Sequence, residues 1–248
     1  MRRFGLLLFL VTIAARVAAE PEPVVKFHLE PTSDFNEPGK KTVDADAQRA
    51  FKAGLSAMAK GDLDAARDDF LKVLQTVPDS VPTMVNLGLV EFRAKNLEKA
   101  EMLLQNVVNM APGSSLGWLV LGIVQYDRGR FDNALASLAQ AAVLDPKNPT
   151  VHQYLGVTVG QKGWYSGAED EMRKAIELDP DYAEAHFNLA VFYLQRNPPA
   201  VELARRHYQR ALDLGAAPDA DLERSLAPKA APAAVGTSNI QRPASNTQ

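Results

Sequence analysis

The sequence predicts an all-α fold, a right-handed α-solenoid of about five helix pairs, and three repeating features predict it. Glycine, alanine and proline each recur at intervals of 34 residues. The glycine series is Gly54, Gly88, Gly122 and Gly156, continued by Ala190; the alanine series is Ala66, Ala100, Ala134 and Ala168; the proline series is Pro78, Pro112, Pro146 and Pro180. Three series with one period indicate equal structural units stacked in a row.

Each series has a physical reason within a helix pair. Small side chains are needed where two helices approach closely, because larger ones would push the helices apart. Proline ends the second helix and begins the next turn. Ser80, Ser114 and Asn148 then stand where the N-cap of the next helix is expected. Since one pair cannot bury its apolar faces alone, the units must stack.

The units resemble the tetratricopeptide repeat (TPR) family, of an exported bacterial type. The third unit shows the family pattern best, with Trp118, Leu121, Gly122, Gly129, Phe131, Ala134, Leu138, Ala141 and Pro146. The resemblance implies repeats at 47–80, 81–114, 115–148, 149–182 and 183–216, the last lengthened near Pro198 and Pro199. Residues 217–226 are predicted to form a polar-faced capping helix, with Asp219 as its N-cap.

The two ends of the chain differ from the repeats. Residues 1–19 combine arginines, a short apolar stretch and small residues, which predicts a signal peptide cleaved after Ala19 and a periplasmic or extracellular protein. The apolar stretch is too short to span a bilayer. Residues 20–46 contain four spread prolines and are predicted to form an extended arm. Residues 227–248 lack aromatic residues and are predicted to be a disordered tail.

The composition indicates a non-catalytic protein. There is no cysteine, and the formal net charge of −3 argues against a nucleic-acid partner. No phosphate-binding loop or nucleophile elbow occurs, and the four histidines form no pair at metal-ligand spacing. His152 and His186 share one repeat position, where the family usually has a large aromatic residue, so we expect packed substitutes. No cofactor and no metal are expected, nor a membrane span in the mature chain.

The resemblance also implies a binding surface, because first helices line the concave side in this family. The concave positions form a nearly continuous apolar stripe of Phe51, Leu55, Met58, Val85, Leu89, Phe92, Leu119, Ile123, Tyr126, Gln153, Val157, Phe187, Val191 and Leu194. Such a groove suits a hydrophobic peptide or an amphipathic helix. The predicted function is a protein–protein interaction scaffold or adaptor of the cell envelope, with self-association possible and the partner's identity open. Two alternatives remain: an assembly chaperone that shields exported hydrophobic segments, and a stripe covered by residues 20–46.

Overall fold

The computed structural model describes residues 45–227, and this part of the chain contains eleven α-helices and no strand. The helices are α2 (Ala45–Ala59), α3 (Leu63–Thr76), α4 (Val81–Arg93), α5 (Leu97–Met110), α6 (Ser115–Asp127), α7 (Phe131–Leu144), α8 (Pro149–Gln161), α9 (Tyr165–Leu178), α10 (Ala183–Leu194), α11 (Val201–Asp213) and α12 (Ala220–Leu226). The predicted all-α solenoid of five helix pairs with a capping helix is confirmed.

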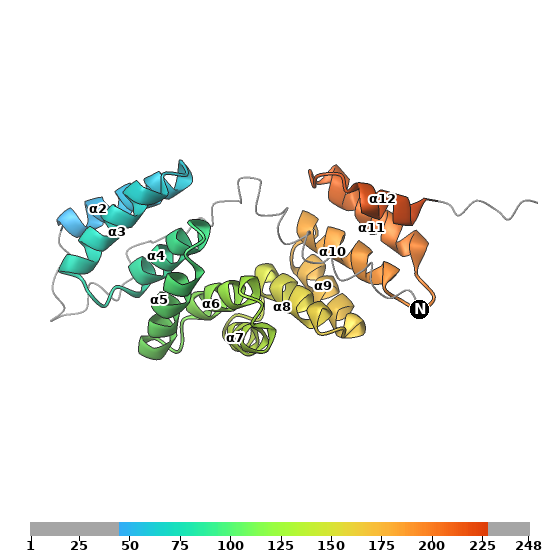
Figure 1. The fold of residues 1–248 in the computed structure, drawn as a ribbon, viewed down its shortest axis with the longest axis horizontal. Coiled ribbons are helices and arrows are strands. Elements are labelled where there is room, and N and C mark those ends of the chain that lie inside the picture. The colour runs from blue at the N-terminus through green and yellow to red at the C-terminus, as the bar shows by residue number, and fades with distance from the viewer. Residues whose placement is uncertain (1–44, 228–248) are drawn as a thin grey trace, which may run out of the picture.

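The five pairs follow one another in an arc (Figure 1). Each helix packs against the next one in the chain, and the first helices of neighbouring repeats also touch, α4 with α6, α6 with α8 and α8 with α10. In Figure 1, α4 and α6 lie toward the hollow side of the arc, and α5 and α7 lie toward its outer side. The first helices therefore form the inner row. No helix among residues 45–227 is long and apolar enough to cross a membrane.

The glycine series lies at the contact between the two helices of each pair. A Cβ atom added at these positions would meet a side chain of the second helix: Phe70 at 2.7 Å for Gly54, Leu104 at 2.9 Å for Gly88, Leu138 at 2.6 Å for Gly122 and Met172 at 2.6 Å for Gly156. All four partner side chains are fully buried. The alanine series is equally buried on the second helices. Each of the first four pairs therefore closes because a large side chain lies directly over a glycine backbone, and the fifth pair has Ala190 at this position.

The turns inside the pairs depend on a left-handed residue. Gly61, Gly129 and Gly163 have φ of 77°, 71° and 79°, values that glycine adopts without steric cost. The second repeat has Lys95 at this place, with φ of 62°. The turns between pairs are closed by caps, as Ser114 Oγ accepts a hydrogen bond from the backbone N–H of Gly117 at 3.1 Å.

The other two expected caps differ from each other. Asn148 Oδ1 accepts from the backbone N–H of Thr150 at 3.1 Å, as an N-cap side chain should. Ser80 occupies the N-cap position of α4, yet its Oγ lies 2.7 Å from Thr83 Oγ1 and makes no capping bond. Pro82 favours the start of α4 in another way. Proline has no backbone N–H, so in the first helical turn it removes a donor that would otherwise lack a partner.

Helix α12 ends the stack as a cap on α11. The side chain of Asp219 accepts from the backbone N–H groups of Asp221 and Leu222 at 3.0 and 2.9 Å. Leu222 and Leu226 are buried, and Tyr208 Oη accepts from the backbone N–H of Asp219 at 2.8 Å. At the other end α2 begins at Ala45. The predicted signal peptide at 1–19, the rest of the arm from 20 and the tail after 227 lie outside the described residues.

The fourth position of three repeats carries a ring that binds the preceding turn. Trp118 Nε1 donates to the carbonyl oxygen of Pro112 at 2.9 Å. His152 Nε2 lies 3.0 Å from the carbonyl oxygen of Pro146, and His186 Nε2 lies 3.1 Å from that of Pro180. A carbonyl oxygen only accepts, so both histidines carry hydrogen on Nε2. The histidines therefore replace the aromatic residue by keeping its N–H donor, and they pack as expected.

The second ring nitrogen of His186 faces another histidine. His186 Nδ1 and His207 Nδ1 are 2.9 Å apart, and the rings stack with centroids 5.1 Å apart. Since neutral His186 has its hydrogen on Nε2, His207 Nδ1–H is the donor of this bond. Burial lowers the pKa of His207 below its ordinary value of 6.5, and the charges of protonated His186 and of Arg173 lower it further. The ring of Tyr193 also faces His207, at 5.6 Å.

We expect Gly122→Ala to lower the free energy of unfolding by about 1–3 kcal/mol, through overpacking against Leu138. The added methyl group would lie 2.6 Å from Leu138 Cγ and 3.3 Å from its backbone nitrogen, neither of which is the end of a flexible chain. Chemical denaturation measures the change. Gly113→Ala is the matched control, because no atom lies within 4 Å of its added Cβ. Equal stability of the two variants would contradict the close-approach argument.

The stability of the last repeat should fall in mild acid because of His207. Its lowered pKa means that the unfolded chain binds this proton more readily than the folded chain. The contribution of His207 to the free energy of unfolding is thus present above about pH 6.5 and is lost as the pH falls through the lower folded-state pKa.

The variant His207→Gln tests this by denaturation between about pH 7.5 and about pH 5. Glutamine does not titrate and keeps an N–H group for His186 Nδ1. The variant should therefore lose less stability than the parent over this range, by at most about 1.4 kcal/mol per pH unit. An unchanged pH dependence would mean that His207 does not titrate differently on folding.

Candidate protein-binding face

All fourteen residues of the predicted stripe lie on first helices, and we call this set the inner stripe. They are Phe51, Leu55 and Met58 on α2; Val85, Leu89 and Phe92 on α4; Leu119, Ile123 and Tyr126 on α6; Gln153 and Val157 on α8; and Phe187, Val191 and Leu194 on α10. The inner stripe thus follows the hollow side of the arc through five successive repeats.

None of the fourteen side chains is exposed. Seven are buried, namely Met58, Val85, Leu119, Tyr126, Gln153, Val157 and Val191. The other seven, Phe51, Leu55, Leu89, Phe92, Ile123, Phe187 and Leu194, are half-buried and pack against the same core clusters. The buried members hold the repeats together, so any partner contacts chiefly the half-buried ones.

A few polar atoms interrupt this apolar surface. Gln161 Nε2 donates to the Tyr126 hydroxyl at 3.1 Å, across the junction between the third and fourth repeats. Burial raises the pKa of Tyr126, so this phenol stays protonated. Asn86 Oδ1 and Gln153 Oε1 are buried with no hydrogen-bond donor within residues 45–227. Gln153 thus places a buried polar group within the otherwise apolar inner stripe.

Sequence reasoning missed one feature of the inner stripe, a close contact at Gly160. A Cβ atom at Gly160 would lie 2.5 Å from a ring carbon of Phe192, which is fully buried on the next first helix. The fourth repeat therefore has no side chain at the twelfth position because the following repeat occupies the space. A glycine inside a first helix, outside the 34-residue series, is the signal that indicates such an approach.

Charged side chains gather at the junctions between repeats. Arg67 Nε donates to Glu91 Oε1 at 2.6 Å, which joins α3 to α4. Asn96 Nδ2 donates to the other carboxylate oxygen of Glu91 at 2.7 Å. Burial opposes ionisation of Glu91, but the hydrogen bonds from Arg67 and Asn96 outweigh it and lower the pKa of this carboxyl group. The first junction is therefore ionic at neutral pH.

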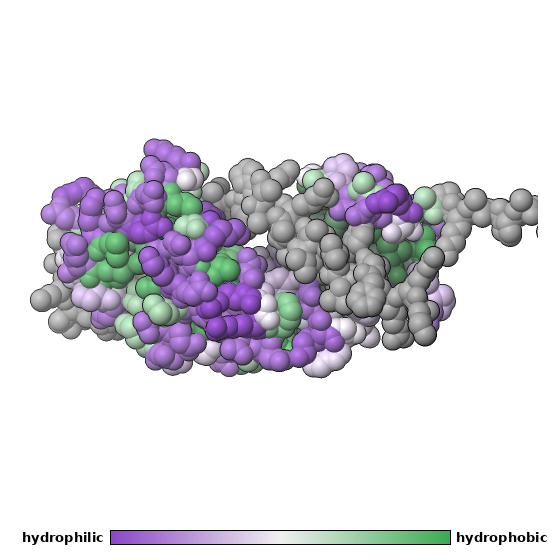
Figure 2. Space-filling model, viewed as in Figure 1, coloured by the Kyte–Doolittle hydropathy of each residue, from purple (hydrophilic) through white to green (hydrophobic). Residues whose placement is uncertain are grey.

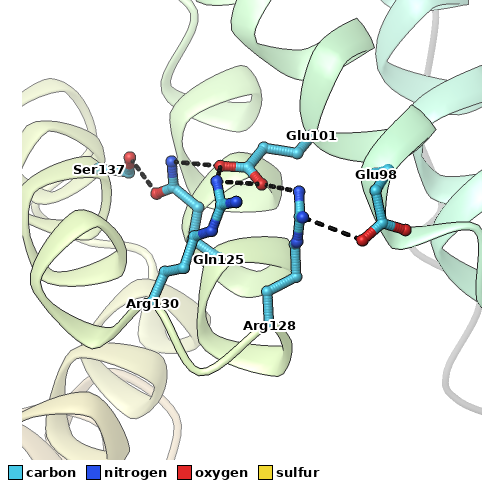
Figure 3. Close-up of polar contacts among 6 residues, drawn as sticks. All are labelled: Glu98, Glu101, Gln125, Arg128, Arg130 and Ser137. Atoms are coloured by element: carbon cyan, nitrogen blue, oxygen red, sulfur yellow. Dashed lines mark hydrogen bonds and ion pairs between the residues drawn. The ribbon is translucent and has the colours of Figure 1, made fainter.

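The second junction centres on the buried carboxylate of Glu101 (Figure 3). Arg130 Nη1 donates to both of its oxygens at 3.0 and 3.1 Å, and Arg128 donates to Glu101 Oε2. Arg128 also reaches Glu98 at 2.9 Å. Gln125 lies 3.5 Å from Glu101 and accepts from the hydroxyl of Ser137 at 2.7 Å. These bonds connect α5 to α6, to the turn after α6 and to α7.

The fourth junction repeats this arrangement around Glu169. Arg196 Nε donates to Glu169 Oε1 at 2.8 Å, and Arg173 Nη2 donates to Oε2 at 2.7 Å. The hydrogen bond from Arg196 lowers the pKa of Glu169 despite its burial, and the charge of Arg173 adds to the effect. The guanidinium groups of Arg196 and Arg173 lie 4.8 and 5.8 Å from the ring centre of Tyr193.

The outer surface is more polar and carries apolar side chains singly. The exposed large apolar residues on second helices include Leu71 on α3, Met102 on α5 and Val143 on α7, the last two being 66% and 75% exposed. The face in Figure 2 is mainly hydrophilic, with apolar residues in separate patches. Apolar residues scattered in this way are normal on a folded domain. The inner stripe differs in that its half-buried apolar side chains recur on successive first helices, with the exception of α8.

The chemistry of the described residues suits binding. Among residues 45–227 no group of three or more His, Cys, Asp or Glu side chains is placed to hold a metal ion. The buried carboxylates Glu91, Glu101 and Glu169 are each engaged by arginines. His152 Nδ1 lies 2.7 Å from Glu171 Oε2. The ionisable groups thus join helices to one another.

The sequence itself matches the family expected from the repeats. One model described as TPR repeat matches residues 122–163 and 161–196, and one described as tetratricopeptide repeat matches residues 51–115. Together the matches cover more than half of the chain. The chain belongs to the tetratricopeptide repeat family. Its repeats make it a protein–protein interaction scaffold. No curated protein matches the sequence.

Solved structures share the TPR fold at low sequence identity. The chain is similar to MamA 41-end from Desulfovibrio magneticus RS-1, with 15% identity and a TM-score of 0.60 over 69% of this chain and 96% of that one. It is also similar to TTC0263, a thermophilic TPR protein in Thermus thermophilus, with 22% identity and a TM-score of 0.59 over 73% of this chain and 96% of that one. These likenesses concern the arrangement of the helices.

Proposed function

We propose that this TPR protein is a non-catalytic adaptor of the cell envelope that holds a hydrophobic peptide or an amphipathic helix against its inner stripe. The observation that carries the proposal is the row of half-buried apolar side chains on four of the five first helices, α2, α4, α6 and α10, while the stripe members on α8 are buried. Because the row extends over several repeats, it suits a partner that runs along the arc.

The electrostatics favour an apolar partner over a charged tail. The inner stripe contains no charged side chain, and the arginines at the first, second and fourth junctions are already bound to Glu91, Glu101 and Glu169. A carboxylate partner would have to compete with these intramolecular pairs. Apolar side chains such as Leu89, Ile123 and Phe187 instead offer dispersion contacts and the release of water.

Export places the adaptor outside the cytoplasm in this proposal. It rests on the sequence of residues 1–19, which has the charge, the short apolar region and the small residues of a cleaved signal peptide. Fusing these residues to a reporter that is active only after export tests the localisation separately from the binding. A scaffold should then purify with one stoichiometric partner, whereas a chaperone should suppress the aggregation of many unfolded clients.

We expect Leu89→Asp combined with Ile123→Asp to reduce partner capture at least about tenfold, because desolvating each carboxylate against an apolar partner costs more than about 1 kcal/mol. Both residues are half-buried, so helical circular dichroism should stay unchanged. The measurement is a crosslinked pull-down from the native envelope, quantified by mass spectrometry.

The matched control places the same two charges on the outer helices, as Met102→Asp with Val143→Asp. These positions are exposed, so the control should fold and retain the partner. Equal loss of the partner in both variants would argue against the inner stripe as the binding surface. Unfolding of the inner variant alone would assign these residues to the core.

A further inference from the structure

A contact between two histidines joins α10 to α11 in the last repeat. His186 Nδ1 and His207 Nδ1 are 2.9 Å apart, which is a hydrogen-bond distance. His186 is only 7% exposed, and its Nε2 atom is fixed by the carbonyl oxygen of Pro180 at 3.1 Å. The two Nδ1 atoms therefore approach this closely only when a single hydrogen lies between them.

The number of protons on the two rings decides whether this contact can exist. When both rings are neutral, His207 Nδ1–H donates to the bare Nδ1 of His186. One added proton on His207 leaves the His186 Nδ1 bare, so the hydrogen bond remains possible. When both rings are protonated, each Nδ1 carries a hydrogen and neither can accept. The separation of 2.9 Å is then no longer possible, and the helices must move apart.

The groups around the two histidines disfavour added positive charge. Burial lowers the pKa of His207, and the charges of protonated His186 and of Arg173 on α9 lower it further. The ring of Tyr193 on α10 also faces His207, with centroids 5.6 Å apart. The charged neighbours that act on His207 in the described part of the chain are thus cations.

The carboxylates of the neighbouring helices are engaged by other groups. On α9, Glu169 accepts hydrogen bonds from Arg173 and Arg196 at 2.7 and 2.8 Å. On α12, Glu223 Oε1 accepts from the hydroxyl of Tyr208 at 3.2 Å. Both carboxylates are therefore paired with groups other than the two histidines.

Tyr208, the next residue of α11, connects the histidines to the capping helix and to the inner stripe. Its ring packs edge-on against that of Phe187, with centroids 5.9 Å apart. Its hydroxyl accepts from the backbone N–H of Asp219, the N-cap of α12, at 2.8 Å. Movement of α11 away from α10 would therefore carry α12 with it and remove the support of Phe187.

We propose that His186 and His207 form a proton-controlled latch, which holds α11 and α12 on α10 while at least one ring is neutral and releases them when both are protonated. Release takes the ring of Tyr208 away from Phe187 and so weakens the last part of the inner stripe. This consequence rests on the proposed function, since it makes partner binding sensitive to mild acid.

Spin labels on the full chain test the latch, because the chain has no cysteine and introduced ones are labelled specifically. One label pair joins α9 to α11, at Lys174→Cys and Gln209→Cys. The control pair joins α7 to α9, at Ala139→Cys and Lys174→Cys, and all three positions are exposed. Between about pH 7.5 and about pH 5, the α9–α11 distance measured by double electron–electron resonance should lengthen by several ångströms, whereas the control distance should not change. An unchanged α9–α11 distance, or an equal change in both pairs, would overturn the proposal.

The variant His207→Gln shows whether titration of the two histidines causes the movement. Its amide does not titrate and can either donate to a bare Nδ1 of His186 or accept from Nδ1–H, so the contact survives in acid. The labelled variant should therefore keep the α9–α11 distance at about pH 5. The matched control is His152→Gln, one repeat earlier, which should open like the parent because His152 contacts Glu171 instead of a second histidine. Opening of His207→Gln in acid, or loss of opening in His152→Gln, would contradict the latch.

The latch and the proposed function fail separately. In the crosslinked pull-down at about pH 5, the parent should capture severalfold less partner than His207→Gln, and equal capture would overturn the regulation of binding. If the labels separate but Leu89→Asp with Ile123→Asp keeps the partner at neutral pH, the latch exists and the partner binds elsewhere. If the labels do not separate, the latch is wrong whether or not the inner stripe binds a partner.

Discussion

The close approach of the two helices within each repeat is the constraint on which the rest of the structure depends. At Gly54, Gly88, Gly122 and Gly156 a large side chain of the second helix lies where a Cβ atom would otherwise stand. Because the same contact recurs every 34 residues, the first four pairs share this internal contact and follow one another with a similar step along the arc. The similar step is what places equivalent positions of successive first helices in one row.

The junctions between repeats recur at the same interval of 34 residues but differ in the side chains that form them. The twenty-first residue of one repeat meets the eleventh of the next, as Arg67 meets Glu91 and Glu101 meets Gln125. At the third junction these positions hold Leu135 and Val159, which are half-buried in the core.

The differences between junctions make each one specific. A carboxylate placed against Leu135 or Val159 would lose its arginine partners and stay buried, which is costly. The glycine series gives the first four repeats the same internal contact, whereas the junctions differ from one another in charge. Uniform packing and specific pairing thus act at different contacts of the same helices.

The sequence predicts those parts of the fold that depend on the residue type at a single position. The glycine contact needs only a missing side chain, so its period can be read directly, and the cap at Asp219 follows from local chemistry. The junction around Glu101 could not be read in this way, because Arg128 and Arg130 are 27 and 29 residues away and the bonds depend on where the turn directs them. Opposite charges 24 residues apart, as in Arg67 and Glu91, are the signal that would have suggested such junctions.

Burial of the inner stripe was likewise beyond sequence reasoning. The repeat positions indicate which side chains face the hollow side, but their exposure depends on how closely neighbouring first helices approach. Gly160 and Phe192 illustrate this, because the fourth repeat has glycine where a side chain would overlap the Phe192 ring of the fifth repeat. Two apolar residues of the same helix can therefore differ in solvent exposure. Val85 is nearly inaccessible, whereas Leu89 is only half-buried.

Histidine at the fourth position links more segments than the aromatic residue it replaces. Trp118 has one N–H group, and it binds the turn before its helix. His152 and His186 make the same bond through Nε2 and have a second nitrogen available. His152 uses it toward Glu171 on α9, and His186 uses it toward His207 on α11.

A histidine here therefore connects the preceding turn, its own helix and the second helix of its repeat. The two second partners require different protons, because a carboxylate accepts from Nδ1–H whereas His207 donates to a bare Nδ1. Two repeats with the same residue at the same position thus reach their second helices through different partners, a carboxylate in the fourth repeat and a second imidazole in the fifth.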